Sequence, residues 1–299
     1  MKPFLIGLLI ATFALAEVQA ATFYVSPSGN DKNSGSKSKP FATLQRAQQA
    51  VREFKQKGKR DEPVTVLLRK GTYDLAEPVV FEPADSGSSK SPVTYAAAPG
   101  EQPVLSGGRR ITGWRKHNEK LWVADLPEVN SGAWRFNQLY VNGELRPRAR
   151  TPNKGFYIVA GCPEGTPKTV NYHKDCQSFE FKPGDIRADW TNLQDVEVIV
   201  YHFWTDSHLP IKSVDATSNL VTFVHKAGKV FTDDFTENGA RYVVENVFEA
   251  LDEPGEWYLN RRTGSLYYMP KPGEEMDKVE FIAPRLPAFL HLRGKATQR

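Results

Sequence analysis

The chain has 299 residues, a formal net charge of +4, 40% hydrophobic residues and 11% aromatic residues. This length and apolar content can bury one large core or two modest ones, which excludes a disordered chain. Lys and Arg are dispersed among the acids without an arginine-rich block, so we expect no nucleic-acid partner and favour a neutral or acidic glycan.

Residues 1–20 have the pattern of a signal peptide. Lys2 precedes an apolar run from Phe4 to Ala16, and Val18-Gln19-Ala20 places small or compact residues where a signal peptidase cleaves. The alternative, a membrane anchor, needs about 20 apolar residues, and Glu17 interrupts the run. We therefore expect cleavage after Ala20 and a secreted or periplasmic protein without a membrane partner.

The next region, residues 21–115, begins with a predicted strand at Phe23–Val25 and a loop rich in turn formers. Apolar residues then recur at helical spacing after Thr43, a candidate N-cap, and Gly58 can end the helix. We expect this helix, Thr43–Lys57, to cover the open end of a β-structure.

Short apolar strands follow the helix at intervals of about 11 to 15 residues: Val64–Leu68, Pro78–Phe81, Pro92–Tyr95 and Pro103–Leu105. This rhythm suits either a β-sandwich or the coils of a solenoid. Three of the strands begin with Pro-Val, and proline is tolerated as the first residue of a strand. The prolines favour the solenoid, although the sandwich stays open on this evidence.

Longer, aromatic-rich strands over residues 116–280 predict an inserted β-sandwich-like domain. Asn142-Gly143 and Thr263-Gly264 indicate hairpin turns, and a short helix is an option at Val244–Leu251. The other predicted strands of the insert are Phe136–Val141, Val196–Trp204, Ile211–Val214, Leu220–Val224, Trp257–Leu259 and Leu266–Met269.

Residues 281–299 return to short apolar runs broken by Pro284 and Pro287. Because a solenoid repeat needs neighbours and a terminal cap to bury its faces, we expect most of the coils to be missing from this sequence. The predicted fold is thus mainly β: the start of a right-handed parallel β-helix with one capping α-helix, plus the inserted domain.

Several motifs resemble bacterial right-handed β-helix glycoside hydrolases, and glycoside hydrolase family 141 most of all. The first region contributes Phe23-Tyr-Val-Ser-Pro-Ser-Gly-Asn-Asp31 and Pro103-Val-Leu-Ser-Gly-Gly108. The insert contributes Arg148-Ala-Arg-Thr-Pro-Asn153, Leu251-Asp-Glu-Pro-Gly-Glu-Trp-Tyr258 and Leu266-Tyr-Tyr-Met-Pro270.

The resemblance implies hydrolysis of plant or algal polysaccharide, of the α-fucosidase or xylanase type. Family members carry their catalytic acids on coils that would follow Arg293, so the resemblance assigns no catalytic residue here and leaves the activity of this chain open. A non-catalytic glycan-binding or scaffold protein and a calcium-dependent polysaccharide lyase are the alternatives.

Glycoside hydrolysis needs two carboxylates about 5.5 Å or about 6.5–9.5 Å apart, and the sequence marks no such pair. Five carboxylates are candidates, each more typical of a solvated or turn position than of a catalytic one: Asp85, Asp206, Glu245, Asp252 and Glu256.

The clearest binding signal is the stretch Tyr201–His208, because sugars stack on aromatic rings and hydrogen-bond to His and Asp. Four residues are candidate substrate-binding residues: His202, Trp204, Asp206 and His208. In the alternative reading, Tyr201 and Phe203 face a core, and His202, Trp204 and Asp206 alternate outward on the same strand.

Two further groups of residues have both a binding and a structural interpretation. Arg146, Arg148 and Arg150 suit a carboxylated sugar, or an edge-strand or domain-interface role, which the pattern favours. Asp31 and Asn33 resemble the start of a calcium loop, but position twelve is Ala42, which favours a plain turn. No cofactor motif is present in the sequence, and we expect no cofactor and no metal.

Cys162 and Cys176 lie in one Pro- and Gly-rich stretch. For an exported protein we predict a disulfide between them. The alternatives are two free thiols or a metal site that includes His173, although two Cys and one His do not complete a structural zinc site.

Overall fold

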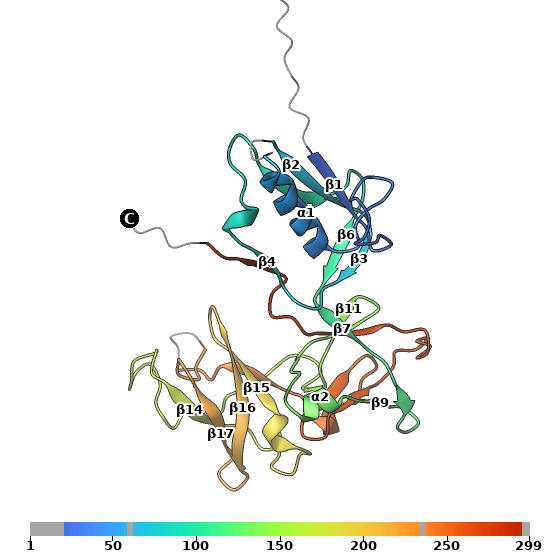
Figure 1. Ribbon diagram of the computed structural model, residues 1–299. Coiled ribbons are helices and arrows are strands. Elements are labelled where there is room, and N and C mark those ends of the chain that lie inside the picture. The colour runs from blue at the N-terminus through green and yellow to red at the C-terminus, as the bar shows by residue number, and fades with distance from the viewer. Residues whose placement is uncertain (1–20, 59–61, 234–236, 295–299) are drawn as a thin grey trace, which may run out of the picture. The chain divides into compact units, whose positions relative to one another are not determined.

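The computed structural model describes residues 21–58, 62–233 and 237–294 (Figure 1). The predicted signal peptide lies outside these residues. The chain divides into two compact units, unit 1 of Met1–Gly107 with Leu286–Arg299, and unit 2 of Gly108–Arg285. Both units are mainly β, as predicted. The insert begins and ends a few residues outside the expected range of 116–280.

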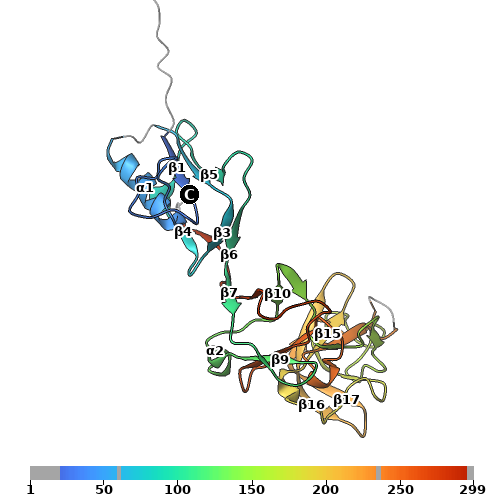
Figure 2. The same ribbon diagram turned by 90° about the vertical axis from the view of Figure 1, so that its right-hand side faces the viewer.

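Unit 1 contains three small sheets in which every strand pair is parallel. The first holds β1 (Ala21–Val25), β2 (Val64–Leu68) and β5 (Val93–Ala97). The second pairs β3 (Gly71–Asp74) with β6 (Pro103–Ser106), which lie side by side in Figure 2. The third pairs β4 (Val79–Phe81) with β22 (Leu290–Leu292).

The order of these pairings shows how unit 2 is inserted. Strands β2, β3 and β4 follow one another along the chain, and they pair in the same order with β5, β6 and β22. Unit 2 lies in the chain between β6 and β22. The chain therefore leaves unit 1 after β6 and comes back to it at β22, which pairs in parallel with β4.

The predicted helix is confirmed as α1 (Leu44–Gln56), with Thr43 as its N-cap. The Thr43 hydroxyl accepts a hydrogen bond from Arg46 N at 3.1 Å, which satisfies one of the free amides at the helix start. Leu44, Ala47, Ala50 and Val51 form the buried face of α1 and share one core with Val25, Val64 and Val66.

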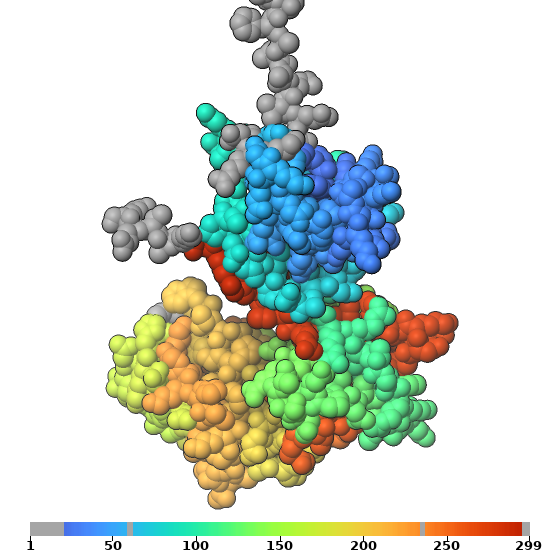
Figure 3. Space-filling view, in the orientation of Figure 1, coloured from blue at the N-terminus to red at the C-terminus, as the bar shows by residue number. Residues whose placement is uncertain are grey.

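Unit 2 contains two four-stranded antiparallel sheets. One has the order β11 (Glu144–Arg146), β10 (Leu139–Val141), β21 (Phe281–Pro284) and β7 (Gly108–Ile111). The other has the order β19 (Trp257–Asn260), β20 (Ser265–Tyr268), β9 (Trp122–Asp125) and β8 (Arg115–Lys116). Segments far apart in sequence are therefore neighbours: β20 pairs with β9, and β21 pairs with β7. The green and red surfaces of unit 2 adjoin in Figure 3 for this reason.

Both predicted hairpin turns are confirmed. Asn142 and Gly143 join β10 to β11 with φ angles of 50° and 79°, the left-handed values that this two-residue turn requires. Thr263-Gly264 lies in the turn between β19 and β20. A short helix, α2 (Pro127–Asn130), follows β9.

The largest sheet has seven strands, and its main path runs β12 (Arg150–Thr151), β18 (Arg241–Glu245), β15 (Glu197–Tyr201), β16 (Asp206–Asp215), β17 (Leu220–Ala227) and β14 (Cys176–Glu180). β13 (Tyr157–Ile158) also pairs with β18. The short helix proposed at Val244–Leu251 is wrong, because Val243 and Val244 are buried in β18 opposite β15 and only Phe248–Ala250 form a 3-10 turn.

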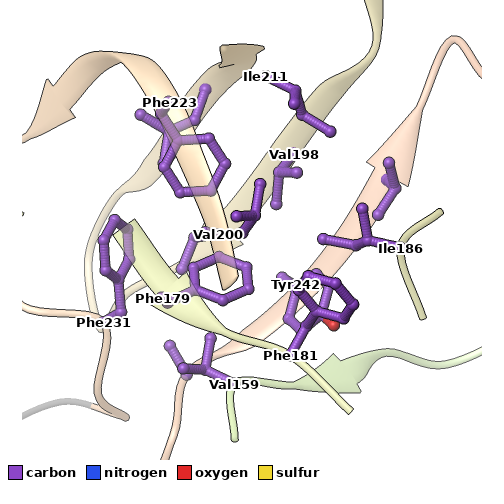
Figure 4. Close-up of a cluster of buried hydrophobic side chains, with 14 of the residues drawn as sticks. Val159, Phe179, Phe181, Ile186, Val198, Val200, Ile211, Phe223, Phe231 and Tyr242 are labelled. Atoms are coloured by element: carbon purple, nitrogen blue, oxygen red, sulfur yellow. The ribbon is translucent and has the colours of Figure 1, made fainter. Parts of the chain in front are cut away.

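This sheet curves around the larger core of unit 2. β14 and β18 are four strand spacings apart, which is about 19 Å in a flat sheet, yet the rings of Phe179 on β14 and Tyr242 on β18 have centroids 5.0 Å apart. Phe223 and Phe231 complete the aromatic cluster in Figure 4. The two layers predicted for the insert therefore belong to one continuous sheet whose inner face is this core.

Phe179→Ala should lower the free energy of unfolding of unit 2 by about 3–5 kcal/mol, because it leaves a cavity where a ring contacts three others. Val224→Ala is the control, since Val224 is 48% exposed on neighbouring β17. All six tryptophans lie in unit 2, so their fluorescence in a denaturant titration measures this unit. Equal midpoints for the two variants would contradict this packing.

Candidate functional site

The four candidate substrate-binding residues lie on the hairpin formed by β15 and β16. Its turn, residues 202–205, is closed by a hydrogen bond from His202 N to Thr205 O at 2.8 Å. In the strands, Ser207 lies opposite Val200 on the core side, whereas His208 lies opposite Ile199 on the other side. The hairpin therefore distributes the four side chains over two faces and does not bring them to one point.

His202 lies inside unit 2. Its Nε2 is 3.0 Å from the Ser207 hydroxyl, and its ring stacks toward Phe231 at a centroid distance of 6.5 Å. Burial, reinforced by the positive charge of Lys229, lowers the pKa of His202 to about 4. The imidazole is therefore neutral near pH 7 and supports the hairpin from the core.

Trp204 and Phe203 form an exposed aromatic tip, with 69% and 59% of their surfaces accessible. Their ring centroids are 4.7 Å apart in an edge-to-face arrangement. The Lys229 ammonium lies 5.9 Å from the Trp204 ring centroid and 5.7 Å from that of Tyr172, and it donates to Thr205 Oγ1 at 3.1 Å. Lys229 thus connects the exposed Trp204 ring to the buried Tyr172 ring, which fixes the tip relative to the core.

The outward orientation of Trp204 fits both interpretations of the sequence, whereas Phe203 and His202 lie on the opposite sides from those that the alternation predicts. The alternating pattern placed Phe203 in a core, but Phe203 is exposed and His202 is buried. The reason is that residues 202–205 form a turn and not a strand, so the two-residue alternation ends at Tyr201. Lys229 and Tyr172 come from distant segments, and no local motif marked them as neighbours of the tip.

Asp206 and His208 lie on the other face of the sheet, in a row of charged groups. His208 Nε2 is 3.6 Å from Asp206 Oδ2, and His208 Nδ1 is 3.7 Å from Glu197 Oε1. The other oxygen of Glu197 accepts from Arg148 Nη1 at 2.7 Å, and Glu245 Oε2 lies 3.5 Å from the same nitrogen. One guanidinium therefore joins β15 and β18 through two carboxylates.

Glu197 and Glu245 are directly opposite each other on neighbouring strands. Burial raises the pKa of Glu245, while Arg148 and Arg150 act in the opposite direction. Arg148 is itself buried, and its guanidinium lies 5.9 Å from the Trp257 ring centroid. The charge of Arg148 is thus engaged by two carboxylates within unit 2, where it links neighbouring strands.

The remaining candidate carboxylates are held by neighbouring groups. Asp85 accepts two hydrogen bonds from Arg52, both at 2.6 Å, and Asp252 accepts from Asn153 Nδ2 at 2.8 Å. Glu256 is buried and accepts from the amides of Asp252 and Glu253, at 3.2 and 3.1 Å. Burial raises the pKa of Glu256 to about 7.

The loop considered for calcium caps α1 instead. Asp31 Oδ1 accepts from Ala42 N and Thr43 N at 2.8 and 2.9 Å, and Oδ2 accepts from the Thr43 hydroxyl at 2.9 Å. The negative charge lies beside the positive end of the helix. Across the part of the chain that the structure describes, no group of three or more acidic, His or Cys side chains suits a metal ion.

The predicted disulfide is absent from the structure, where Cys162 and Cys176 are free. The Cys162 thiol donates to Phe231 O at 3.3 Å, and Cys176 is buried in the core on β14. Burial raises the pKa of Cys162 to about 11. The nearby Cys176 thiol raises the pKa of Cys162 further.

Comparison with known proteins identifies the family. The model of the GH141 insertion domain matches residues 119–271, just over half of the chain. The chain belongs to this family, which confirms the family predicted from the motifs. None of the helices among the described residues has the length and apolar character needed to cross a membrane.

Two further proteins are similar to this chain. A solved structure described as a glycoside hydrolase is 28% identical, with a TM-score of 0.75, over 92% of this chain and 48% of its own. The uncharacterized protein YwoF of Bacillus subtilis (strain 168) is 36% identical over 84 residues, which are 28% of this chain and 15% of the relative. The chain thus spans about half the length of the similar structure and a smaller share of YwoF.

His202 should make the protein less stable in acid. Because folding lowers its pKa from 6.5 to about 4, its contribution is complete above pH 6.5 and is lost as the pH falls toward 4. The non-titrating variant His202→Gln should lose about 2 kcal/mol less stability over this range. Denaturant titrations of both proteins at pH 7, 5.5 and 4 test this, and parallel pH profiles would disprove it.

Both cysteines should titrate as thiols. Ellman's reagent should react with two groups per chain in denaturant and slowly in the native protein, because the protonated thiol is a poor nucleophile. Cys162→Ser should leave one reactive group after denaturation. A chain whose mass is 2 Da lower, with no titratable thiol, would show that the disulfide forms after all.

Proposed function

We propose that the chain is the N-terminal part of an exported glycoside hydrolase acting on plant or algal polysaccharide, of the α-fucosidase or xylanase type. Membership of the GH141 insertion-domain family and the likeness to a glycoside hydrolase structure support this. The apolar run at residues 4–16 supports secretion or export to the periplasm.

In this proposal, unit 1 is the beginning of a right-handed parallel β-helix. Successive chain segments place three short strands in the same order, and each strand pairs in parallel with its counterpart in the next segment. Short parallel strands on three sheets are what stacked coils of a solenoid require. The helix α1 packs on the core of this unit, where a cap would lie.

Unit 2 binds the glycan in this proposal, and the aromatic tip carries the argument. Trp204 is the most exposed aromatic residue of unit 2 among those described, and Phe203 is next to it. Leaving a large aromatic ring exposed to water is unfavourable relative to burying it. Lys229 lies over the Trp204 ring and donates a hydrogen bond to Thr205, which holds the tip in place. A sugar ring stacked on Trp204 would cover the apolar surface while its hydroxyls contact polar neighbours.

His202, Asp206 and His208 take different parts in this site. Buried His202 supports the hairpin and does not touch the glycan. Asp206 and His208 are about half exposed, so a chain that continues past the tip can hydrogen-bond to them. The proposal assigns binding to unit 2 and no bond cleavage, which needs an acid and a second carboxylate on opposite sides of the bond.

Trp204→Ala should weaken glycan binding at least tenfold, because it removes the ring on which the sugar stacks. Calorimetry with xylo-oligosaccharides and fucosylated oligosaccharides measures the dissociation constants. Leu145→Ala is the matched control, since Leu145 is a 56% exposed apolar residue on β11, in a different sheet of unit 2. Binding that is unchanged in Trp204→Ala, or equally weakened in both variants, would refute the role of the tip.

A further inference from the structure

A second site in unit 2 has the composition of an anion-binding pocket. A hollow of about 580 Å³ lies between the end of α2, the loop that follows it, the 3-10 turn at Leu193–Asp195 and the segment after β19. Its polar lining includes Arg135, Asn137, Gln194 and Arg261. The volume is within the range of about 300–1,000 Å³ typical of small-molecule sites.

The two arginines bring more positive charge than the pocket neutralises. Arg261 Nη1 has one carboxylate within reach, Asp195 Oδ1 at 3.8 Å. The other oxygen of Asp195 accepts from the Arg261 amide at 2.8 Å and from Asn192 Nδ2 at 2.5 Å. Among the described residues, no carboxylate pairs with the exposed Arg135. One acid, already engaged in two hydrogen bonds, thus faces two guanidinium groups.

The surroundings of Arg261 favour an incoming anion. Burial, followed by repulsion from Arg148 and to a smaller degree from Arg135, lowers the pKa of Arg261, and Asp195 and Glu197 offset this only in part. The charged guanidinium is therefore less well stabilised here than in water. A negative group in the pocket would supply the missing favourable interaction.

The remaining lining suits a sugar. The exposed side chains of Asn137 and Gln194 offer amide donors and acceptors for hydroxyl groups. Phe136, which is 6% exposed, and Pro210 provide apolar surface. Arginine forks bind carboxylates and other oxyanions with two parallel hydrogen bonds.

We propose that this pocket binds the anionic group of an acidic glycan, the carboxylate of a uronic acid or a sulfate ester. The inference rests on the proposed glycan-binding function and adds the class of glycan to it. The pocket is separate from the aromatic tip, because none of its lining residues belongs to the turn at 202–205. Binding at the two sites can therefore be tested separately.

Another hollow with two arginines shows why Arg135 and Arg261 are distinctive. Arg150 and Arg187 line a pocket of about 250 Å³ together with Glu249 and Asp252. There, Arg187 makes a two-pronged pair with Asp189 at 2.9 and 2.7 Å. Acids balance the arginines of that pocket, and it gives no comparable reason to select an anion.

Calorimetry at low salt with three oligosaccharides of equal length tests the inference: a trigalacturonate, a sulfated trisaccharide and neutral xylotriose. Arg135→Gln/Arg261→Gln should weaken binding of the acidic ligand at least tenfold and leave xylotriose unchanged. Arg135→Lys should recover only part of the affinity, because lysine lacks the planar fork. Arg187→Gln is the control, and tryptophan fluorescence verifies folding. If the double variant does not fold, Arg135→Gln alone replaces it.

Each outcome decides the inference. Tighter binding of trigalacturonate that depends on the two arginines identifies a carboxylate, and the same result with the sulfated sugar identifies a sulfate ester. Acidic sugars that bind no better than xylotriose, or that bind independently of both arginines, overturn it. In that case, xylotriose binding that is lost in Trp204→Ala leaves the aromatic tip standing. Conversely, xylotriose binding that is unchanged in Trp204→Ala, together with acidic binding that needs the two arginines, removes the tip and retains the pocket.

Discussion

The closure of the seven-stranded sheet on its aromatic core is the constraint on which unit 2 depends. Contact between Phe179 and Tyr242 is attainable only if the intervening strands curve, and β16 permits this by pairing with β15 in its first half and with β17 in its second. A register shift between Ile211 and Ser213 marks the change of partner, as bulges do where strands bend. The outward display of the hairpin tip follows from this curvature, because His202 is anchored inside it.

Local sequence signals predicted correctly those elements whose conformation depends on neighbouring residues alone. The N-cap at Thr43 and the turn Asn142-Gly143 act over four residues or fewer, and the structure contains both. Residues 244–251 show the limit of such signals. Their spacing suits a helix, but Val243 and Val244 gain more by completing β18 between β15 and β12, since tertiary pairing overrides modest propensity.

The candidate site was predicted less well, for a related reason. The sequence identified Trp204 but could not show that the strand stops at Tyr201, and this decides which side chains face out. Residues that are distant in sequence but close in the structure leave no periodic pattern in the sequence. Lys229 beside Trp204 is one example, and Arg135 and Arg261, which line the same hollow, are another. The arginine at 148 was conspicuous, yet its partners on β15 and β18 use its charge for cohesion. Residue type therefore indicated which side chains could bind a ligand, but the fold determined which of them are exposed and unpaired.

The way unit 2 enters and leaves the chain has a consequence for the history of such proteins. Leu286 N donates to Gly107 O at 2.9 Å, and just inside the insertion β7 pairs with β21, with Gly108 opposite Pro284. The two connections thus start and finish at one spot, so β22 can pair with β4 whatever length of chain separates them. Because the entropy of closing a loop grows only logarithmically with its length, evolution can enlarge, exchange or delete the module at small thermodynamic cost. The same junction is a natural point for grafting a foreign domain onto unit 1.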